Sequence, residues 1–86
     1  MKLIKIYKEG CAPCKMLDPA LLMVHEARPD VTIEHLNIED NRDAIEKYGE
    51  RTVPMLILEK DGTVIHTLNG LQTARNIIGS IDEHDS

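Results

Sequence analysis

The feature that most constrains this chain is a pair of cysteines, Cys11 and Cys14, placed between a strand and a helix. Leu3–Tyr7 is a short, nearly continuous apolar run, which predicts a strand covered on both faces. From Ala12 to about Arg28, apolar residues recur at helical spacing, which predicts a helix. The two cysteines are therefore expected where the first strand ends and the first helix begins.

The remaining elements alternate in a way typical of an α/β fold. Pro19 predicts a kink in the first helix, because a proline there removes a backbone hydrogen bond. Lys60-Asp61-Gly62-Thr63 carries the Asp-Gly hairpin pattern. We expect further strands at Val31–Ile38, Met55–Glu59 and Val64–Leu68, further helices at about Arg42–Tyr48 and Ala74–Ile81, and a frayed tail at 82–86. The order β-α-β-α-β-β-α predicts one domain, residues 1–86, with a four-stranded mixed sheet flanked by helices.

The start of the helix gives the cysteine pair its expected chemistry. Backbone N–H groups at a helix N-terminus lack partners and favour negative charge, so a thiolate there is stabilised and its pKa falls. Cys11 is expected to be the exposed, attacking sulfur, and Cys14 the more buried one. A Cys11 thiolate would attack a disulfide, and Cys14 would then displace the product and leave a Cys11–Cys14 disulfide.

Other uses of two cysteines are weaker interpretations. A structural zinc site needs two more ligands, and the four histidines are scattered without ligand spacing. A permanent disulfide across so short a loop would remove little chain entropy. A small metal-carrier domain that binds through the cysteine pair stays an alternative of another class. Such domains follow a β-α-β-β-α-β order, whereas this chain is predicted to end in a helix.

Charge and hydropathy narrow the expected partners and location. The chain has 15 acidic and 10 basic residues and no basic run, which argues against binding to nucleic acid. Its first residues are too short and too charged for a signal peptide, and no apolar stretch approaches the roughly 20 residues that cross a bilayer. We expect a monomer in the reducing cytoplasm. In that compartment a cysteine pair is more often catalytic or metal-binding than structural.

From Leu3 to about Ile81 the chain resembles thioredoxin. The similarity rests on the cysteine motif with the run that leads to Pro19, on Leu36–Asn41, on Lys47–Pro54, on Lys60–Thr63 and on Gly70. The resemblance implies a thioredoxin-like fold and a reductase of protein disulfides. The Ala-Pro pair between the cysteines resembles the Gly-Pro of reducing members, which implies a reduction potential nearer about −270 mV than that of a strong oxidant.

The resemblance also implies roles for single residues. Pro54 would follow a cis peptide bond and face the cysteine pair, and the backbone of Val53 would hydrogen-bond an extended substrate segment. Cys11 and Cys14 would be the catalytic pair, with no other cofactor. The residues expected to contact the substrate are Gly10, Ala12, Pro13, Val53, Pro54 and Gly70.

The implied partners are disulfide-containing proteins as substrates, and thioredoxin reductase or a similar electron donor. The alternative is a glutaredoxin-type reductase that depends on glutathione, because Thr52-Val53-Pro54 and the short length fit that family as well. Against it, Leu68–Leu71 lacks the paired glycines and following acidic residues of a glutathione site.

The chain also departs from the thioredoxin pattern. It lacks the family's first strand and helix, and Gly10 stands where the family has Trp. Lys5 takes the place of a buried Asp thought to move protons for the second cysteine, and His35 the place of that Asp's Lys partner. His35 could take over part of the proton handling, but the favoured interpretation is a strand residue, with Lys5 extending to water. Asp18 is expected to lie exposed beside the kink.

Overall fold

The computed structural model describes residues 1–46 and 53–85. Along the chain these form β1 (Lys2–Tyr7), α1 (Ala12–Met16), α2 (Asp18–Ala27), β2 (Thr32–Asn37), α3 (Arg42–Glu46), β3 (Met55–Lys60), β4 (Thr63–Asn69) and α4 (Ala74–His84). The predicted order of elements is confirmed. Within the described residues, no helix is both long enough and apolar enough to span a membrane.

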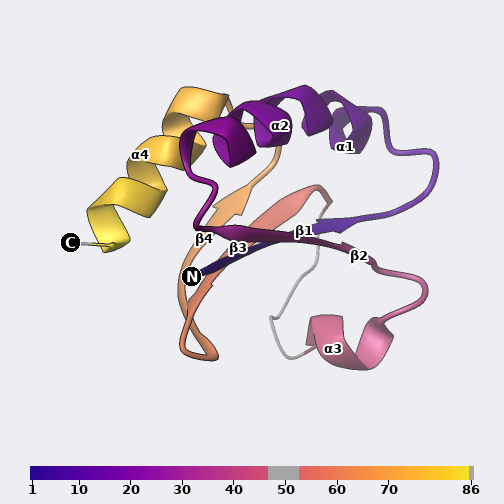
Figure 1. Cartoon of the computed structure of the whole chain (residues 1–86). Coiled ribbons are helices and arrows are strands. Elements are labelled where there is room, and N and C mark those ends of the chain that lie inside the picture. The colour runs from indigo at the N-terminus through magenta and orange to yellow at the C-terminus, as the bar shows by residue number, and fades with distance from the viewer. Residues whose placement is uncertain (47–52, 86) are drawn as a thin grey trace.

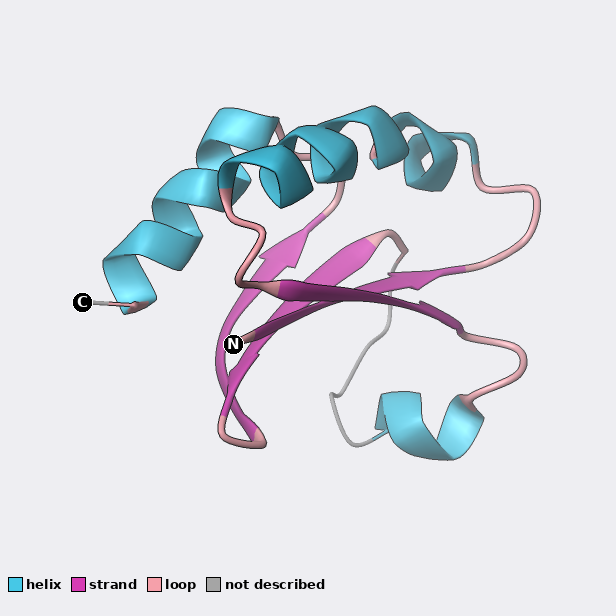
Figure 2. Cartoon of the chain, in the orientation of Figure 1, coloured by secondary structure: helices cyan, strands magenta, loops and turns pink. Residues whose placement is uncertain are grey.

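The four strands form one mixed sheet in the order β2-β1-β3-β4. β1 pairs in parallel with β2, whereas the β1–β3 and β3–β4 pairs are antiparallel. Helices α1, α2 and α4 lie along one face of the sheet, and α3 lies beyond the other (Figures 1 and 2). The predicted α/β architecture, a four-stranded mixed sheet flanked by helices, is therefore present.

The apolar run of β1 follows from its position, because both of its faces are covered. Leu3 packs with side chains of α2, β3 and α4 in one cluster of buried residues. Ile4 and Ile6 point the other way and pack with Met55 and Ile57 in a second cluster. Lys5 is buried as well, and by the period-two alternation of a strand it shares the side of Leu3. A cation thus lies beneath the helices that follow the cysteines.

The predicted kink separates two helices. α1 ends at Met16 and α2 begins at Asp18, with Leu17 between them. Pro19 lies in the first turn of α2, where a proline needs no helical hydrogen-bond partner for its nitrogen. The proline therefore permits a new helix start, and the break turns Asp18 toward the sheet.

The hairpin between β3 and β4 turns where the sequence predicts it. Asp61 has φ 55° and Gly62 has φ 79°. A two-residue loop with positive φ at both positions matches the right-handed twist of the flanking strands, and the Asp-Gly pair tolerates this conformation. The short helix α3 was predicted to run to Tyr48, which lies outside the described residues.

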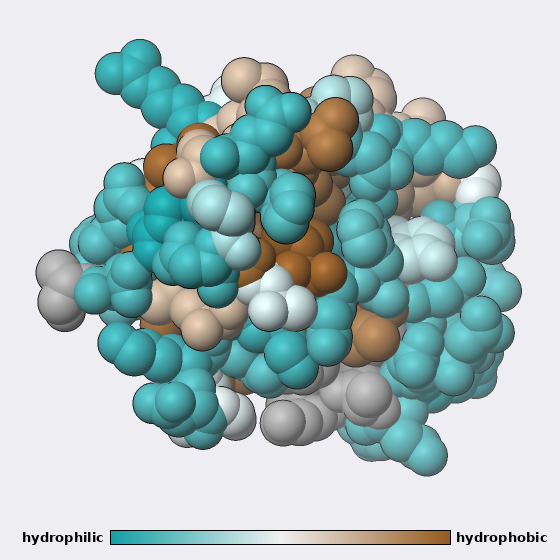
Figure 3. Space-filling view, viewed as in Figure 1, coloured by the Kyte–Doolittle hydropathy of each residue, from teal (hydrophilic) through white to brown (hydrophobic). Residues whose placement is uncertain are grey.

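A groove follows the open edge of the sheet, between α2 and β2. Its volume is about 600 Å³, and its lining includes Leu21, Leu22, Pro29 and Ile33. Figure 3 shows brown, apolar side chains gathered on this face, below α2 in the orientation of Figure 1. Leu22 is 63% exposed, so the groove leaves apolar surface in water.

The prediction of a frayed tail from Asp82 is wrong, because α4 continues to His84. The guanidinium of Arg28, at the end of α2, donates to the carboxylates of Asp30, Asp82 and Asp85. The ring of His84 also stacks on that of His66, with the centroids 4.6 Å apart. These contacts join residues far apart in the sequence, which the local pattern does not reveal.

We predict that Arg28→Ala lowers the melting temperature by a few degrees, because it removes the ion pairs that hold the end of α4 to α2. Hydrogen bonds from Arg28 hold the pKa of Asp30 below its ordinary value. The stabilisation that the Arg28–Asp30 pair gives the folded state is therefore present above the ordinary carboxyl pKa. It is lost as pH falls through the lowered pKa of Asp30. Calorimetry from neutral to acidic pH should show the variant and the wild type converging in acid. Arg75→Ala, on the exposed side of α4, is the control; an equal loss in both variants would contradict the prediction.

Candidate active site

Cys11 occupies the N-cap position of α1. At this position the backbone can stabilise a thiolate without help from other side chains. The backbone of Cys11 is extended, with φ −91° and ψ 104°, and its sulfur accepts a hydrogen bond from the backbone N–H of Cys14 at 3.2 Å. The backbone N–H of Lys15 donates to the carbonyl oxygen of Cys11. A thiolate at this sulfur would keep the hydrogen bond from Cys14, and a bond to the charged form lowers a pKa.

The two cysteines are joined by a disulfide, with their Cα atoms 5.2 Å apart. Cys11 is 8% exposed and Cys14 is 1% exposed, so the order of accessibility is the expected one. The helical turn brings the two sulfurs together. The expectation of an exposed Cys11 is wrong, because both cysteines are buried, but Cys11 is the more accessible of the two. An incoming disulfide can therefore reach Cys11, while Cys14 is placed to attack Cys11 from inside.

The strand register brings the other predicted site residues to the same end of the sheet. Met55, which follows Pro54, pairs with Ile6 near the end of β1 and with Asn69 at the end of β4. The Val53–Pro54 peptide bond is cis. The backbone N–H of Gly70 donates to the carbonyl oxygen of Pro54 at 2.8 Å, so these two loops are tied together.

The remaining predicted contact residues differ in how far they are exposed. Gly10, Ala12 and Pro13 are exposed, and Val53 is half-buried. Gly10 has φ +76°, a conformation that side chains with a Cβ rarely adopt, and it allows the chain to turn from β1 into α1. The exposed backbone on either side of Cys11 is thus available to a substrate.

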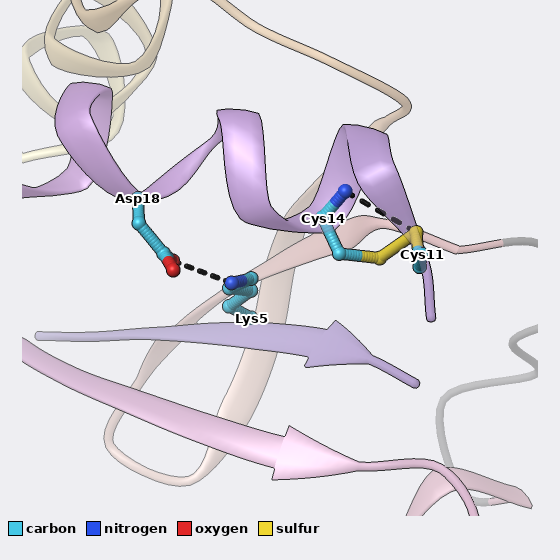
Figure 4. The surroundings of a disulfide bond; sticks show 4 residues. All are labelled: Lys5, Cys11, Cys14 and Asp18. Carbon is cyan, nitrogen blue, oxygen red and sulfur yellow. Dashed lines mark hydrogen bonds and ion pairs between the residues drawn. A yellow bond between two sulfur atoms is a disulfide. The ribbon is translucent and has the colours of Figure 1, made fainter. Parts of the chain in front are cut away.

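Behind Cys14, the structure corrects the expectation for Lys5 and confirms that Asp18 lies exposed beside the kink. Lys5 does not extend to water; it is 4% exposed, and its ammonium donates to Oδ1 of Asp18 at 2.5 Å (Figure 4). The same ammonium lies 5.2 Å from the centroid of the Tyr7 ring. The side chain of Asp18 is about half exposed, yet one of its oxygens pairs with the buried cation. Sequence reasoning left both residues out of the site.

Lys5 and Asp18 line a cavity that Cys14 also lines. Its volume is about 270 Å³, and its other lining residues are Tyr7, Lys8, Glu9, Lys15 and His35. His35 is the β2 partner of Lys5 in the sheet register. Desolvation of the ring, followed by the positive charge of Lys5, lowers the pKa of His35 below its ordinary value. The imidazole is therefore largely neutral at neutral pH.

Comparison with known proteins assigns the chain to a family. Residues 1–83 match the family model described as Thioredoxin. A thioredoxin from Chlamydia caviae is 38% identical over 82 residues, which are 95% of this chain and 80% of that protein. One from Pseudomonas aeruginosa is 36% identical over 93% of this chain and 75% of that protein.

Solved structures give the same result. A mutant thioredoxin from Halobacterium salinarum superposes with a TM-score of 0.90 at 28% identity, covering 99% of this chain and 74% of the other. Mitochondrial thioredoxin 3 from Saccharomyces cerevisiae, in its oxidised form, gives a TM-score of 0.87 at 27% identity, covering 95% and 76%. Both likenesses extend over nearly all of this chain.

We predict that, in the reduced protein, alkylation distinguishes the two cysteines. Cys11 should react with iodoacetamide with an apparent pKa below the ~8.5 of a free thiol, because the N-cap position stabilises its thiolate. Cys14 should react far more slowly because it is buried. Rates measured against pH on Cys14→Ser and Cys11→Ser, each holding one thiol, would show this. Equal rates and ordinary pKa values in both variants would contradict it.

Proposed function

Because the chain belongs to the thioredoxin family and is a thiol–disulfide oxidoreductase, we propose that it works as a reductant of protein disulfides in the cytoplasm. The observation that carries this is the placement of the pair, with Cys11 capping α1 as the more accessible cysteine and Cys14 fully buried behind it. One sulfur is thereby suited to meet a substrate and the other to release it.

The proposed cycle has two exchanges. The Cys11 thiolate attacks one sulfur of a substrate disulfide, which forms a mixed disulfide and expels the other sulfur as a thiolate. Cys14 then loses its proton and attacks Cys11, and the bond between Cys11 and the substrate breaks. The substrate has gained two electrons and two protons, and the protein holds the Cys11–Cys14 disulfide.

We further propose that the substrate lies across the end of the sheet. The backbone of Val53 would hydrogen-bond an extended substrate segment beside the attacked disulfide, as a short added strand. Gly10, Ala12 and Pro13 would contact the same segment from the cysteine loop, and Gly70 would contact it from the other side. Pro54 is fully buried, so it would support this surface from beneath. The tie between Gly70 and Pro54 supports this arrangement, because it holds that side of the surface in one position.

The oxidised pair must be reduced again after each cycle, and we propose that thioredoxin reductase or a similar dithiol donor does so. The two sulfurs carry both electrons, so the cycle needs no other cofactor. We also propose that the chain acts as a monomer, since the cycle uses residues of one chain only.

We predict that the wild type catalyses the reduction of insulin disulfides when supplied with NADPH and thioredoxin reductase. Replacing the donor by glutathione and glutathione reductase should give a much lower rate. Cys11→Ser should abolish catalysis, because no nucleophile meets the substrate. Cys14→Ser should accumulate a covalent adduct with the substrate, because the second exchange is blocked.

Consumption of NADPH and mass spectrometry of the adduct measure these outcomes. Lys60→Ala, in the hairpin at the far end of the sheet, is the control and should keep the wild-type rate. Turnover with glutathione alone would overturn the proposed donor. The absence of an adduct in Cys14→Ser would overturn the proposed cycle.

A further inference from the structure

Lys5 lies buried beside the active site, and the cycle above does not use it. A buried ammonium loses its hydration, which is costly unless partners replace the water. The partner here, Asp18, is itself about half exposed. An apolar side chain of similar length would fill the same space without this cost, and replacing a buried ion pair by apolar residues is often neutral or stabilising. Stability therefore gives little reason for a lysine at this position.

The position of the ammonium gives a better reason. β1 directs Lys5 under the break between α1 and α2, where it lines the same cavity as Cys14. Figure 4 shows the ammonium between the carboxylate of Asp18 and the side chain of Cys14. Asp18 and the ring of Tyr7 hold it there, so it cannot swing away to water.

The positive charge of Lys5 acts on another group that lines this cavity, the ring of His35. His35 lines the cavity opposite Lys5 in the sheet, and the positive charge of Lys5 contributes to lowering the pKa of its ring. A cation that disfavours a second positive charge favours a negative one in the same place. A thiolate on Cys14 would benefit from the same field, since Cys14 lines the same cavity.

We propose that Lys5, fixed by Asp18, is a positioning residue for the second exchange, in which its ammonium stabilises the Cys14 thiolate. The proposal rests on the proposed cycle and deepens it. In thioredoxins a buried acid occupies this position, whereas this chain has a buried cation there. Cys14 would then not need a carboxylate to remove its proton during the attack.

The step balances without any added reactant. Cys14 releases its proton to water through the cavity and becomes a thiolate beside the Lys5 ammonium. Its sulfur attacks Cys11, the Cys14–Cys11 bond forms, and the bond between Cys11 and the substrate breaks. The substrate leaves as a thiolate and takes a proton from water, while Lys5 keeps its proton throughout.

Other charged groups face the same cavity, but Lys5 is the buried one. Glu9 and Asp18 are acidic and Lys8 and Lys15 are basic, and all four are exposed, so water and salt screen them. His35 is largely neutral at neutral pH, and Tyr7 contributes its ring. Among the charged residues that line this cavity, the buried one is therefore positive.

The test uses the Cys11→Ser background, where Cys14 is the only thiol and the neighbouring residue is uncharged, as it is in the mixed disulfide. The pKa of Cys14 is followed by thiolate absorbance against pH. Lys5→Met should raise it by about one to three units, the range for an adjacent opposite charge. Lys5→Arg, which keeps the positive charge, should leave the pKa of Cys14 near its wild-type value. Asp18→Asn should lower the pKa of Cys14, because the amide oxygen can still accept the hydrogen bond that holds the ammonium while the negative charge is removed.

Lys2→Met is the matched control, because Lys2 lies on the same strand, pairs with Glu34 at the surface and is 40% exposed. In the background with both cysteines, Lys5→Met should also move the pH profile of insulin reduction to higher pH and make the reduction potential more negative. Circular dichroism confirms that each variant is folded.

Two outcomes would overturn the inference while leaving the proposed function intact. In the first, the wild type reduces insulin but Lys5→Met leaves the Cys14 pKa and the pH profile unchanged. In the second, Asp18→Asn lowers the pKa of Cys14 but slows turnover as much as Lys5→Met, which would make Asp18 the base. A wild type without turnover would instead contradict the proposed function, and the pKa measurement would still decide the role of Lys5.

Discussion

The fold and the site both depend on β1 being buried on both faces. Ile4 and Ile6 pack with Met55 and Ile57 on one side, and Leu3 packs with residues of α2, β3 and α4 on the other. β2 pairs along one edge and β3 along the other, so the strand is held on four sides. The loop that follows it carries Cys11 to a fixed point above the end of the sheet. The same strand carries Lys5 into the space behind Cys14, so one element positions both the nucleophile and the cation.

Much of this could be predicted from the sequence, because it depends on local patterns. The apolar run of β1, the helical spacing after Cys11 and the Asp-Gly turn each predict an element without knowledge of the rest. Their order predicts the mixed sheet, since a crossover helix joins parallel strands and a tight turn joins antiparallel ones. The N-cap position of Cys11 also follows from its place between a strand and a helix.

The features that sequence reasoning missed depend on contacts between distant residues. Lys5 and Asp18 are separated by 13 positions, and they meet because the chain breaks at Leu17 and starts a new helix. The spacing of Asp18 from Cys14 and the inward side of Lys5 were visible signals, but neither one alone predicts an ion pair. The end of α4 is a similar case, because Arg28 stabilises it from 54 positions away.

The two sulfurs thus owe their reactivity to different parts of the chain. Cys11 is stabilised by main-chain N–H groups, which any sequence able to form α1 would supply. Cys14 is buried and faces side chains, so the charge placed beside it is set by substitution at single positions. A change at Lys5 or Asp18 can therefore alter the second exchange while the first stays as it is. A cation there favours the ionised, reduced form of Cys14, which makes the pair a weaker reductant than the same fold with an apolar residue in that place.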